Sequence, residues 1–166
     1  YLNNKDKTFT ESIKNSMSHT SHFTMGVDVA DLNQDGSLDV FTTDMMPYDP
    51  KIFLKSGGED LDKISRIKKD LGFEQQFSRN HMQISRGNNT FSEVAIQTNT
   101  HATDWSWGVL LQDFDSDGRD DIFISNGILK RPNDLDYINY LSNVDFTQYN
   151  NSRQDVIKKK LIDKMP

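Results

Sequence analysis

A nine-residue acidic stretch occurs twice in this sequence and constrains its fold more than any other feature. The copy at 113–121 reads Asp-Phe-Asp-Ser-Asp-Gly-Arg-Asp-Asp, with carboxylates at positions 1, 3, 5 and 9 and glycine at position 6. The copy at 31–39 reads Asp-Leu-Asn-Gln-Asp-Gly-Ser-Leu-Asp. Alternate side chains of a tight turn converge on one point, and the glycine permits the bend that brings position 9 back. Carboxylates this close repel one another unless a cation lies among them, so each stretch predicts a cation-binding loop.

The ligand chemistry favours calcium, at two sites. The loops offer hard oxygen donors without a neighbouring histidine or cysteine, which is typical of Ca²⁺ rather than a transition metal. An EF-hand also begins in this way, but it requires a bidentate glutamate at position 12. That position holds Thr42 in the first copy and Ile124 in the second. A metal-free turn rich in Asp and Gly is the other alternative, and the duplication of the complete pattern argues against it.

The acidic loops belong to a longer repeat. Residues 1–45 and 83–127 align without a gap at an offset of 82 and share 11 identities over 45 positions. Short apolar segments on either side of turn-forming residues predict four strands in each copy, which describes a blade of a β-propeller. One of these strands alternates strictly between large and small residues. Its large residues, expected to face the core, are Phe23, Met25, Val27 and Val29 in one copy and Trp105, Trp107, Val109 and Leu111 in the other.

The small residues of the same strand, Gly26 and Gly108, are expected on the opposite face, where they allow another backbone to approach closely. Trp105 and Trp107 also suggest a carbohydrate-binding surface, but their alignment with Phe23 and Met25 favours core packing.

An insert separates the two repeats, and a tail follows the second repeat. In the insert, 46–82, a helix is expected at about 59–71, because Leu61, Ile64, Ile67 and Leu71 share one face and Gly72 follows. We expect this apolar face to pack against a blade. In the tail, 131–166, helices are expected at 134–141 and at about 152–164. The lysine run 158–160 is expected on the solvent face of the last helix.

Charge and composition exclude several functions. The net charge is −6, but the two loops hold eight of the aspartates, and acids and bases nearly balance elsewhere. Because basic stripes with interleaved aromatics are absent, nucleic-acid binding is not expected. No apolar run is long enough for membrane insertion. At 166 residues the chain predicts one domain. It begins at Tyr1 within an expected strand, so we interpret it as a fragment of a longer protein.

Catalysis is not expected in this chain. Glu11 and Glu93 suggest a pair of carboxylates for glycoside hydrolysis, and His19 and His101 suggest a catalytic pair. Both pairs, however, occupy equivalent positions in the two repeats. Residues duplicated from blade to blade are expected to have structural roles, so we predict that the chain is not an enzyme.

The loop pattern, followed by an apolar strand and preceded by a Gly-Val strand, resembles the FG-GAP (VCBS-like) repeat of integrin α-subunit propellers. The stretch 105–127 is similar to the repeats of proteins with ASPIC/UnbV segments, a group that includes cartilage acidic protein. The resemblance implies a mainly β chain forming a partial β-propeller of two four-stranded FG-GAP-type blades. These would be 1–45 with calcium loop 31–39 and 83–130 with calcium loop 113–121. The helical insert 46–82 and the helical C-terminal tail 131–166 would complete one domain.

The resemblance also implies which residues bind calcium. Side-chain oxygens would come from Asp31, Asn33, Asp35, Asp39, Asp113, Asp115, Asp117 and Asp121. Backbone carbonyls would come from Ser37 and Arg119. Because the neutral Asn33 replaces a carboxylate, we expect the first loop to bind calcium more weakly.

The function that the resemblance implies is a binding or adhesion module of a secreted or cell-surface protein. Its partners would be the remaining blades of a longer chain and a protein or carbohydrate ligand that no local motif identifies. The alternative is a non-catalytic accessory propeller of a carbohydrate-active enzyme, whose catalytic residues would lie outside this chain.

Overall fold

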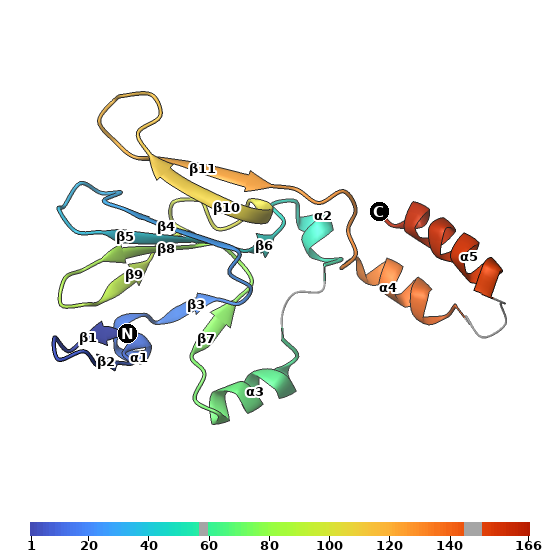
Figure 1. Ribbon diagram of the computed structural model, residues 1–166, viewed down its shortest axis with the longest axis horizontal. Coiled ribbons are helices and arrows are strands. Elements are labelled where there is room, and N and C mark those ends of the chain that lie inside the picture. The colour runs from blue at the N-terminus through green and yellow to red at the C-terminus, as the bar shows by residue number, and fades with distance from the viewer. Residues whose placement is uncertain (57–59, 145–150) are drawn as a thin grey trace. The chain divides into compact units, whose positions relative to one another are not determined.

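The computed structural model describes residues 1–56, 60–144 and 151–166, with 151–157 described by backbone alone (Figure 1). The chain forms two compact units where its length predicts a single domain. Unit 1 comprises 1–47 and 59–127, and unit 2 comprises 48–58 and 128–166. Within the described residues, none of the helices has the length and apolar character needed to cross a membrane.

Unit 1 is mainly β, as predicted. Its helices are α1 (Ile13–Ser16) and α3 (Asp62–Asp70). Its strands are β1 (Leu2–Asn3), β2 (Phe9–Thr10), β3 (His19–Ser21), β4 (Gly26–Ala30), β5 (Asp39–Thr43), β6 (Met45–Met46), β7 (Gln75–Phe77), β8 (His81–Ser85), β9 (Phe91–Glu93), β10 (Asp104–Gln112) and β11 (Asp121–Asn126). They form a four-stranded sheet in the order β4-β5-β8-β9, a three-stranded sheet β11-β10-β6, and the pairs β1-β2 and β3-β7. All pairings are antiparallel except β3-β7.

The four-stranded sheet takes its strands from both sequence repeats, which corrects the expected blade boundaries. β4 and β5 end the first repeat and β8 and β9 begin the second, so the segment between residues 43 and 81 is inserted within this blade-like sheet. The strands of the β1-β2 hairpin pair in the same register as β8 and β9 when the repeats are aligned at the 82-residue offset. Likewise, the β10-β11 hairpin corresponds to β4-β5. Unit 1 therefore holds one complete four-stranded sheet and two half-blade hairpins, and neither repeat forms a blade of its own.

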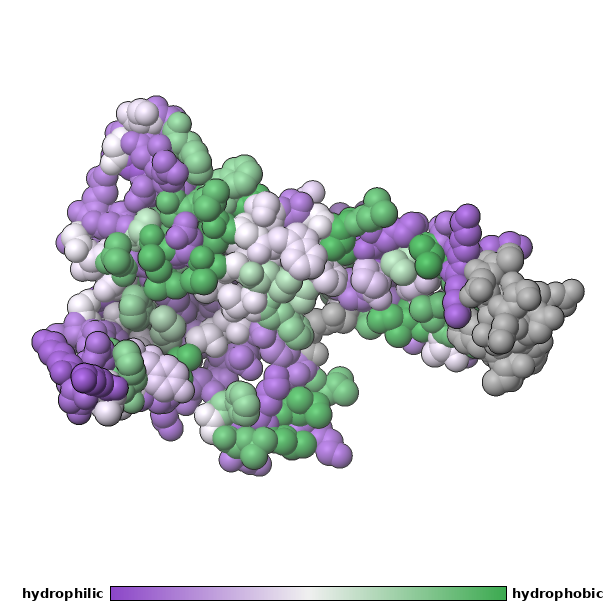
Figure 2. Space-filling view, viewed as in Figure 1, coloured by the Kyte–Doolittle hydropathy of each residue, from purple (hydrophilic) through white to green (hydrophobic). Residues whose placement is uncertain are grey.

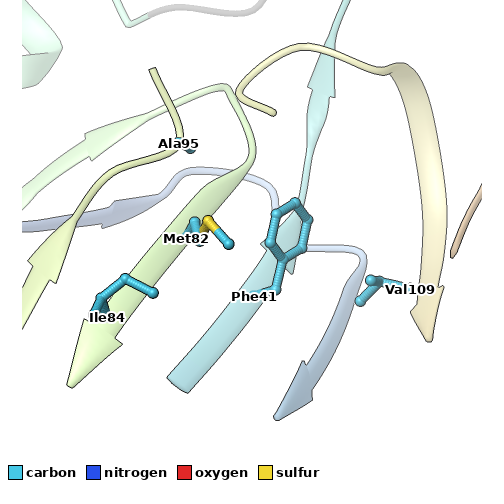
Figure 3. Packing of buried hydrophobic residues seen from close by; sticks show 5 residues of the cluster. All are labelled: Phe41, Met82, Ile84, Ala95 and Val109. Carbon is cyan, nitrogen blue, oxygen red and sulfur yellow. The ribbon is translucent and has the colours of Figure 1, made fainter. Parts of the chain in front are cut away.

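The core lies between the four-stranded sheet and β10. Phe41 on β5 is fully buried and clusters with Met82, Ile84, Ala95 and Val109, as Figure 3 shows. A backbone approaches Gly26 and Gly108 closely, as expected, and for Gly26 it is the backbone of the other glycine-bearing strand. A Cβ on Gly26 would lie 2.9 Å from the Cα of Gly108.

The expected orientation of β4 is wrong. Its buried face carries Ala30, whereas Val27 is 61 % exposed and Val29 is 49 % exposed. The reason is that β10 packs on the glycine face of β4, and this side of the sheet holds the core. In β10, the register shifts at a bulge between Ser106 and Gly108, so Val109 is buried and Trp107 is half-exposed. The core-packing prediction therefore fails for Trp107.

The helix expected at about 59–71 is present as α3, but its apolar face does not pack against a blade. Leu61, Ile64, Ile67 and Leu71 are all exposed, and Figure 2 shows hydrophobic surface at the position of α3. The helix is followed by Gly72, whose φ of 86° suits a helix end. Near this helix, Lys68 Nζ lies 2.8 Å from His22 Nε2, which follows β3, and 2.6 Å from Asp60 Oδ2.

Unit 2 is helical and consists of α2 (Pro50–Phe53), α4 (Leu135–Ser142) and α5 (Asn151–Lys164). Local sequence sets the starts of the first two helices. The Asp49 carboxylate accepts from Lys51 N at 2.8 Å, and the Asp134 carboxylate accepts from Tyr137 N at 2.9 Å, so both act as N-caps. The Tyr137 hydroxyl then donates to Leu161 O at 3.1 Å and joins α4 to α5. Residues 145–150 of the expected tail lie outside the described residues.

Candidate cation-binding loops

The loop 113–121 follows β10 and is closed by hydrogen bonds from its own backbone to its aspartates. Asp113 accepts from Asp117 N through Oδ1 at 3.1 Å and from Gly118 N through Oδ2 at 2.9 Å. Asp115 Oδ1 accepts from Asp117 N at 3.1 Å, and Asp117 Oδ1 accepts from Arg119 N at 2.9 Å. These bonds turn the side chains at positions 1, 3 and 5 inward.

The loop 31–39 follows β4 and repeats this network bond for bond. Asp31 accepts from Asp35 N at 2.9 Å and from Gly36 N at 2.8 Å. Asn33 Oδ1 accepts from Asp35 N at 3.0 Å, and Asp35 Oδ1 accepts from Ser37 N at 2.8 Å. The two loops therefore share one conformation despite the change from Asp115 to Asn33.

Both loops contain a non-glycine residue in the left-handed region. At position 4, φ is 59° for Gln34 and 64° for Ser116, and glycine follows at position 6 with φ of 85° for Gly36 and 87° for Gly118. A left-handed L-residue costs about 1 kcal/mol, so the surrounding hydrogen bonds must hold it in place.

The carboxylates of Asp113, Asp115 and Asp117 converge, with one oxygen from each within 4.8 Å of the others. Three carboxylate oxygens at this spacing could hold a metal ion, and hard oxygen ligands of this kind are those that calcium prefers. In the other loop the amide of Asn33 donates to Asp35 Oδ2 at 3.0 Å. This hydrogen bond, followed by the one from Ser37 N, holds the pKa of Asp35 below its usual value. The amide of the first loop thus stabilises the charged form of one of its own carboxylates.

The aspartates at position 9 close the loops. Asp39 is fully buried, and its carboxylate accepts from Leu32 N at 3.0 Å and from Ser85 N at 2.8 Å. Asp121 Oδ2 accepts from Phe114 N at 3.1 Å in the equivalent way. Ser37 and Arg119 at position 7 are predicted to supply carbonyl ligands. Their N–H groups donate to the aspartates at position 5, which fixes the backbone there.

Glu11 and Glu93, the two carboxylates considered for glycoside hydrolysis, each make their own hydrogen bonds and do not bind each other. Glu11 is exposed and accepts from Ile13 N at 2.6 Å. The buried Glu93 carboxylate is bound by Arg79 at 2.7 Å and by Ala95 N at 2.7 Å. Burial would raise the pKa of Glu93, but these hydrogen bonds outweigh it and lower the pKa to about 2. A carboxylate held ionised in this way is unsuited to general acid catalysis.

A further group of mostly buried side chains surrounds Arg79, and no sequence motif indicated it. His19 Nε2 lies 3.0 Å from Arg79 Nη2 and 3.2 Å from Glu93 Oε2, while the ring of His81 packs 5.3 Å from that of His19. Arg79 lies in the insert, outside both repeats, so no repeat-based signal identifies it. His101, the repeat partner of His19, accepts through its carbonyl from Asn80 N at 2.9 Å.

A protein-family model described as the FG-GAP-like repeat matches residues 1–42 and 68–124, which together make up more than half of the chain. The chain belongs to the FG-GAP-like repeat family. Both acidic loops of this FG-GAP-like chain lie inside the matched segments, and the second segment begins within α3. No curated protein and no solved structure matched the chain.

Proposed function

We propose that this FG-GAP-like chain is a calcium-stabilised segment of a β-propeller that serves as a binding or adhesion module of a secreted or cell-surface protein. The observation that carries the proposal is the bond-for-bond equality of the two loop networks. Two loops with the same inward donors, 82 residues apart, favour a shared ligand rather than two accidental turns. The stretch 105–127 supports a relationship to proteins with ASPIC/UnbV segments as the finer family assignment.

Calcium would neutralise the charge that each loop gathers. In the second loop the clustered Asp113, Asp115 and Asp117 would provide carboxylate ligands. Asp121 would provide the fourth carboxylate. The first loop offers the neutral Asn33 at the third position, so its affinity would be lower. Extracellular modules of this kind bind calcium with Kd of about 10⁻⁴–10⁻³ M.

The exposed face of β4 supports further propeller blades as partners of this chain. Val109 and Leu111 of β10 pack with the core, and Leu111 N donates to Asp28 Oδ2 of β4 at 2.9 Å. Their repeat equivalents, Val27 and Val29, are exposed. By this equivalence a further blade would cover Val27 and Val29 as the four-stranded sheet covers Val109 and Leu111.

Calorimetric calcium titration of the chain tests the metal proposal. We expect two binding events in the millimolar range or below, and Asp117→Ala should abolish the tighter one. The matched control is Asp120→Ala, which removes a charge from the same loop but not a proposed ligand. Binding at millimolar calcium would raise stability by about 0.4–1.4 kcal/mol per site and increase the melting temperature. If heat flow and melting temperature are both unaffected by calcium, the proposal fails.

An accessory propeller of a carbohydrate-active enzyme is the second candidate, and the exposed Trp107 favours it. Its indole N–H donates to Gly127 O at 2.9 Å, which fixes the ring while 49 % of the residue stays exposed. A fixed, half-exposed indole is a stacking platform for a sugar ring. Titration with soluble oligosaccharides, followed by tryptophan fluorescence and compared with Trp107→Ala, tests this platform, and a catalytic domain in the full-length chain would favour the second candidate over the first.

A further inference from the structure

We propose that Gln34, a residue of the first loop, is a positioning residue for calcium in the second loop. This inference rests on the proposed function, because it concerns how one loop prepares the other for its ion. Gln34 is not itself a proposed ligand. Its side-chain amide crosses from one loop to the other, and Nε2 donates to Gly118 O at 2.6 Å.

The bond acts on the peptide that follows the glycine of the second loop. Gly118 has a φ of 87° and no Cβ, and apart from the glycine and its two chain neighbours no heavy atom lies within 4 Å of the place where a Cβ would be. Such a glycine leaves its peptide planes free to rotate. The plane between Gly118 and Arg119 is nevertheless fixed at both ends. Its carbonyl accepts from Gln34, and its N–H donates to Asp117 Oδ1 at 2.9 Å.

This clamped plane lies between two elements of the proposed calcium site. On one side is the Asp117 carboxylate, which belongs to the converging triplet, and on the other is Arg119, whose carbonyl is a proposed ligand. Gly118 N also donates to Asp113 Oδ2 at 2.9 Å. Fixing the plane before the ion arrives reduces the ordering that binding itself would require, so the site is pre-organised.

The relationship runs in one direction. Ser116 occupies the position in the second loop that Gln34 occupies in the first, with nearly the same φ of 64°. Its side chain is two heavy atoms shorter in reach, so it provides no equivalent of the glutamine amide. The first loop therefore supports the second, and the second has no matching donor at that position.

The test is a calcium titration followed by NMR through the amide signals of Gly36 and Gly118, one reporter for each loop. Gln34→Asn keeps an amide and tolerates the left-handed conformation, but it loses the reach. We expect the Gly118 transition to move to about two- to tenfold higher calcium, as for loss of one hydrogen bond, while the Gly36 transition stays within about twofold. Ser116→Asn is the matched control and should leave both transitions in place.

The outcomes separate this inference from the function on which it rests. If neither amide of the unmodified chain responds to millimolar calcium, the calcium proposal itself fails. If both respond and Gln34→Asn leaves the Gly118 transition unchanged, the calcium proposal stands and the role of Gln34 is overturned. An equal shift of both transitions in Gln34→Asn would show a general loss of loop structure and would also overturn it.

Discussion

Gly26 of β4 and Gly108 of β10 lie so close that a Cβ on Gly26 would be 2.9 Å from the Cα of Gly108 and 3.0 Å from the Trp107 carbonyl oxygen. Both neighbours are backbone atoms, which cannot rotate away. The contact lets Asp28, two residues along β4, accept from Leu111 N at 2.9 Å. This hydrogen bond and one from Val29 N hold the pKa of Asp28 below its usual value.

We therefore expect Gly26→Ala to destabilise unit 1 by about 1–3 kcal/mol, since overpacking forces the two strands apart. Urea denaturation measures the change. Gly108→Ala is the matched control, because its Cβ would meet only the movable Ser125 hydroxyl at 3.3 Å. Equal losses in the two variants would contradict the close contact as the cause.

Because the apolar face of α3 is exposed, we expect it to tolerate polar substitutions, although its amphipathic pattern suggested a contact with the core. Ile64 and Ile67 are 42 % and 45 % exposed. Changing both to Gln should lower the free energy of unfolding by less than about 1 kcal/mol. Phe41→Ala, at a fully buried position, should cost about 3–5 kcal/mol. A loss of several kcal/mol in the α3 variant, measured by thermal or urea unfolding, would mean that its apolar face is covered in solution.

His81 predicts a loss of stability in mild acid. It is almost fully buried, and neither ring nitrogen has a hydrogen-bond partner within the described structure. Burial, followed by the Arg79 charge, lowers the pKa of His81 from 6.5 to about 4. The unfolded chain binds a proton that the folded chain resists, so stability declines as pH falls from about 6.5 to about 4 and this contribution levels off below.

The size of this effect is about 3 kcal/mol, from 1.36 kcal/mol per pKa unit. His81→Phe removes the titrating ring, so its free energy of unfolding should depend less on pH between 7 and 4.5. Glu93, with its lowered pKa, contributes stability that is lost only between about pH 4.5 and 2. If the unmodified chain and His81→Phe lose stability in parallel over this pH range, His81 is not the cause of the pH dependence.

The uncovered face of β4 predicts self-association. Val27 and Val29 are exposed, and open apolar sheet faces attract one another. Light scattering should show concentration-dependent association that Val27→Lys with Val29→Lys reduces. Leu54→Lys, at an exposed apolar residue of unit 2, is the control and should have little effect. A monomeric chain that melts cooperatively above about 65 °C would instead show that the sheets close on themselves, against the partial-propeller interpretation.

The loops could be predicted from sequence because their structure is local. Asp113 bonds to amides four and five residues away, and Asp117 to one two residues away. Such contacts depend on residue type and spacing within one turn, and the 82-residue repeat exposed them twice. A close backbone approach at the glycines was also predictable, because small residues aligned at the same position in both repeats, but the pattern did not show that the two glycines would meet each other.

What tertiary structure alone decided are the pairings between distant segments. The sequence pattern placed four strands in each repeat, but it did not show that β5 would pair with β8 across the insert. Alternation in β4 identified two faces without showing which one β10 would cover. The bonds from Arg79 to Glu93 and from Gln34 to Gly118 join separate segments of the chain, the second pair being 84 residues apart. Residue spacing encodes contacts within a turn or strand, whereas these contacts depend on which sheet faces and edges meet when the whole chain is packed.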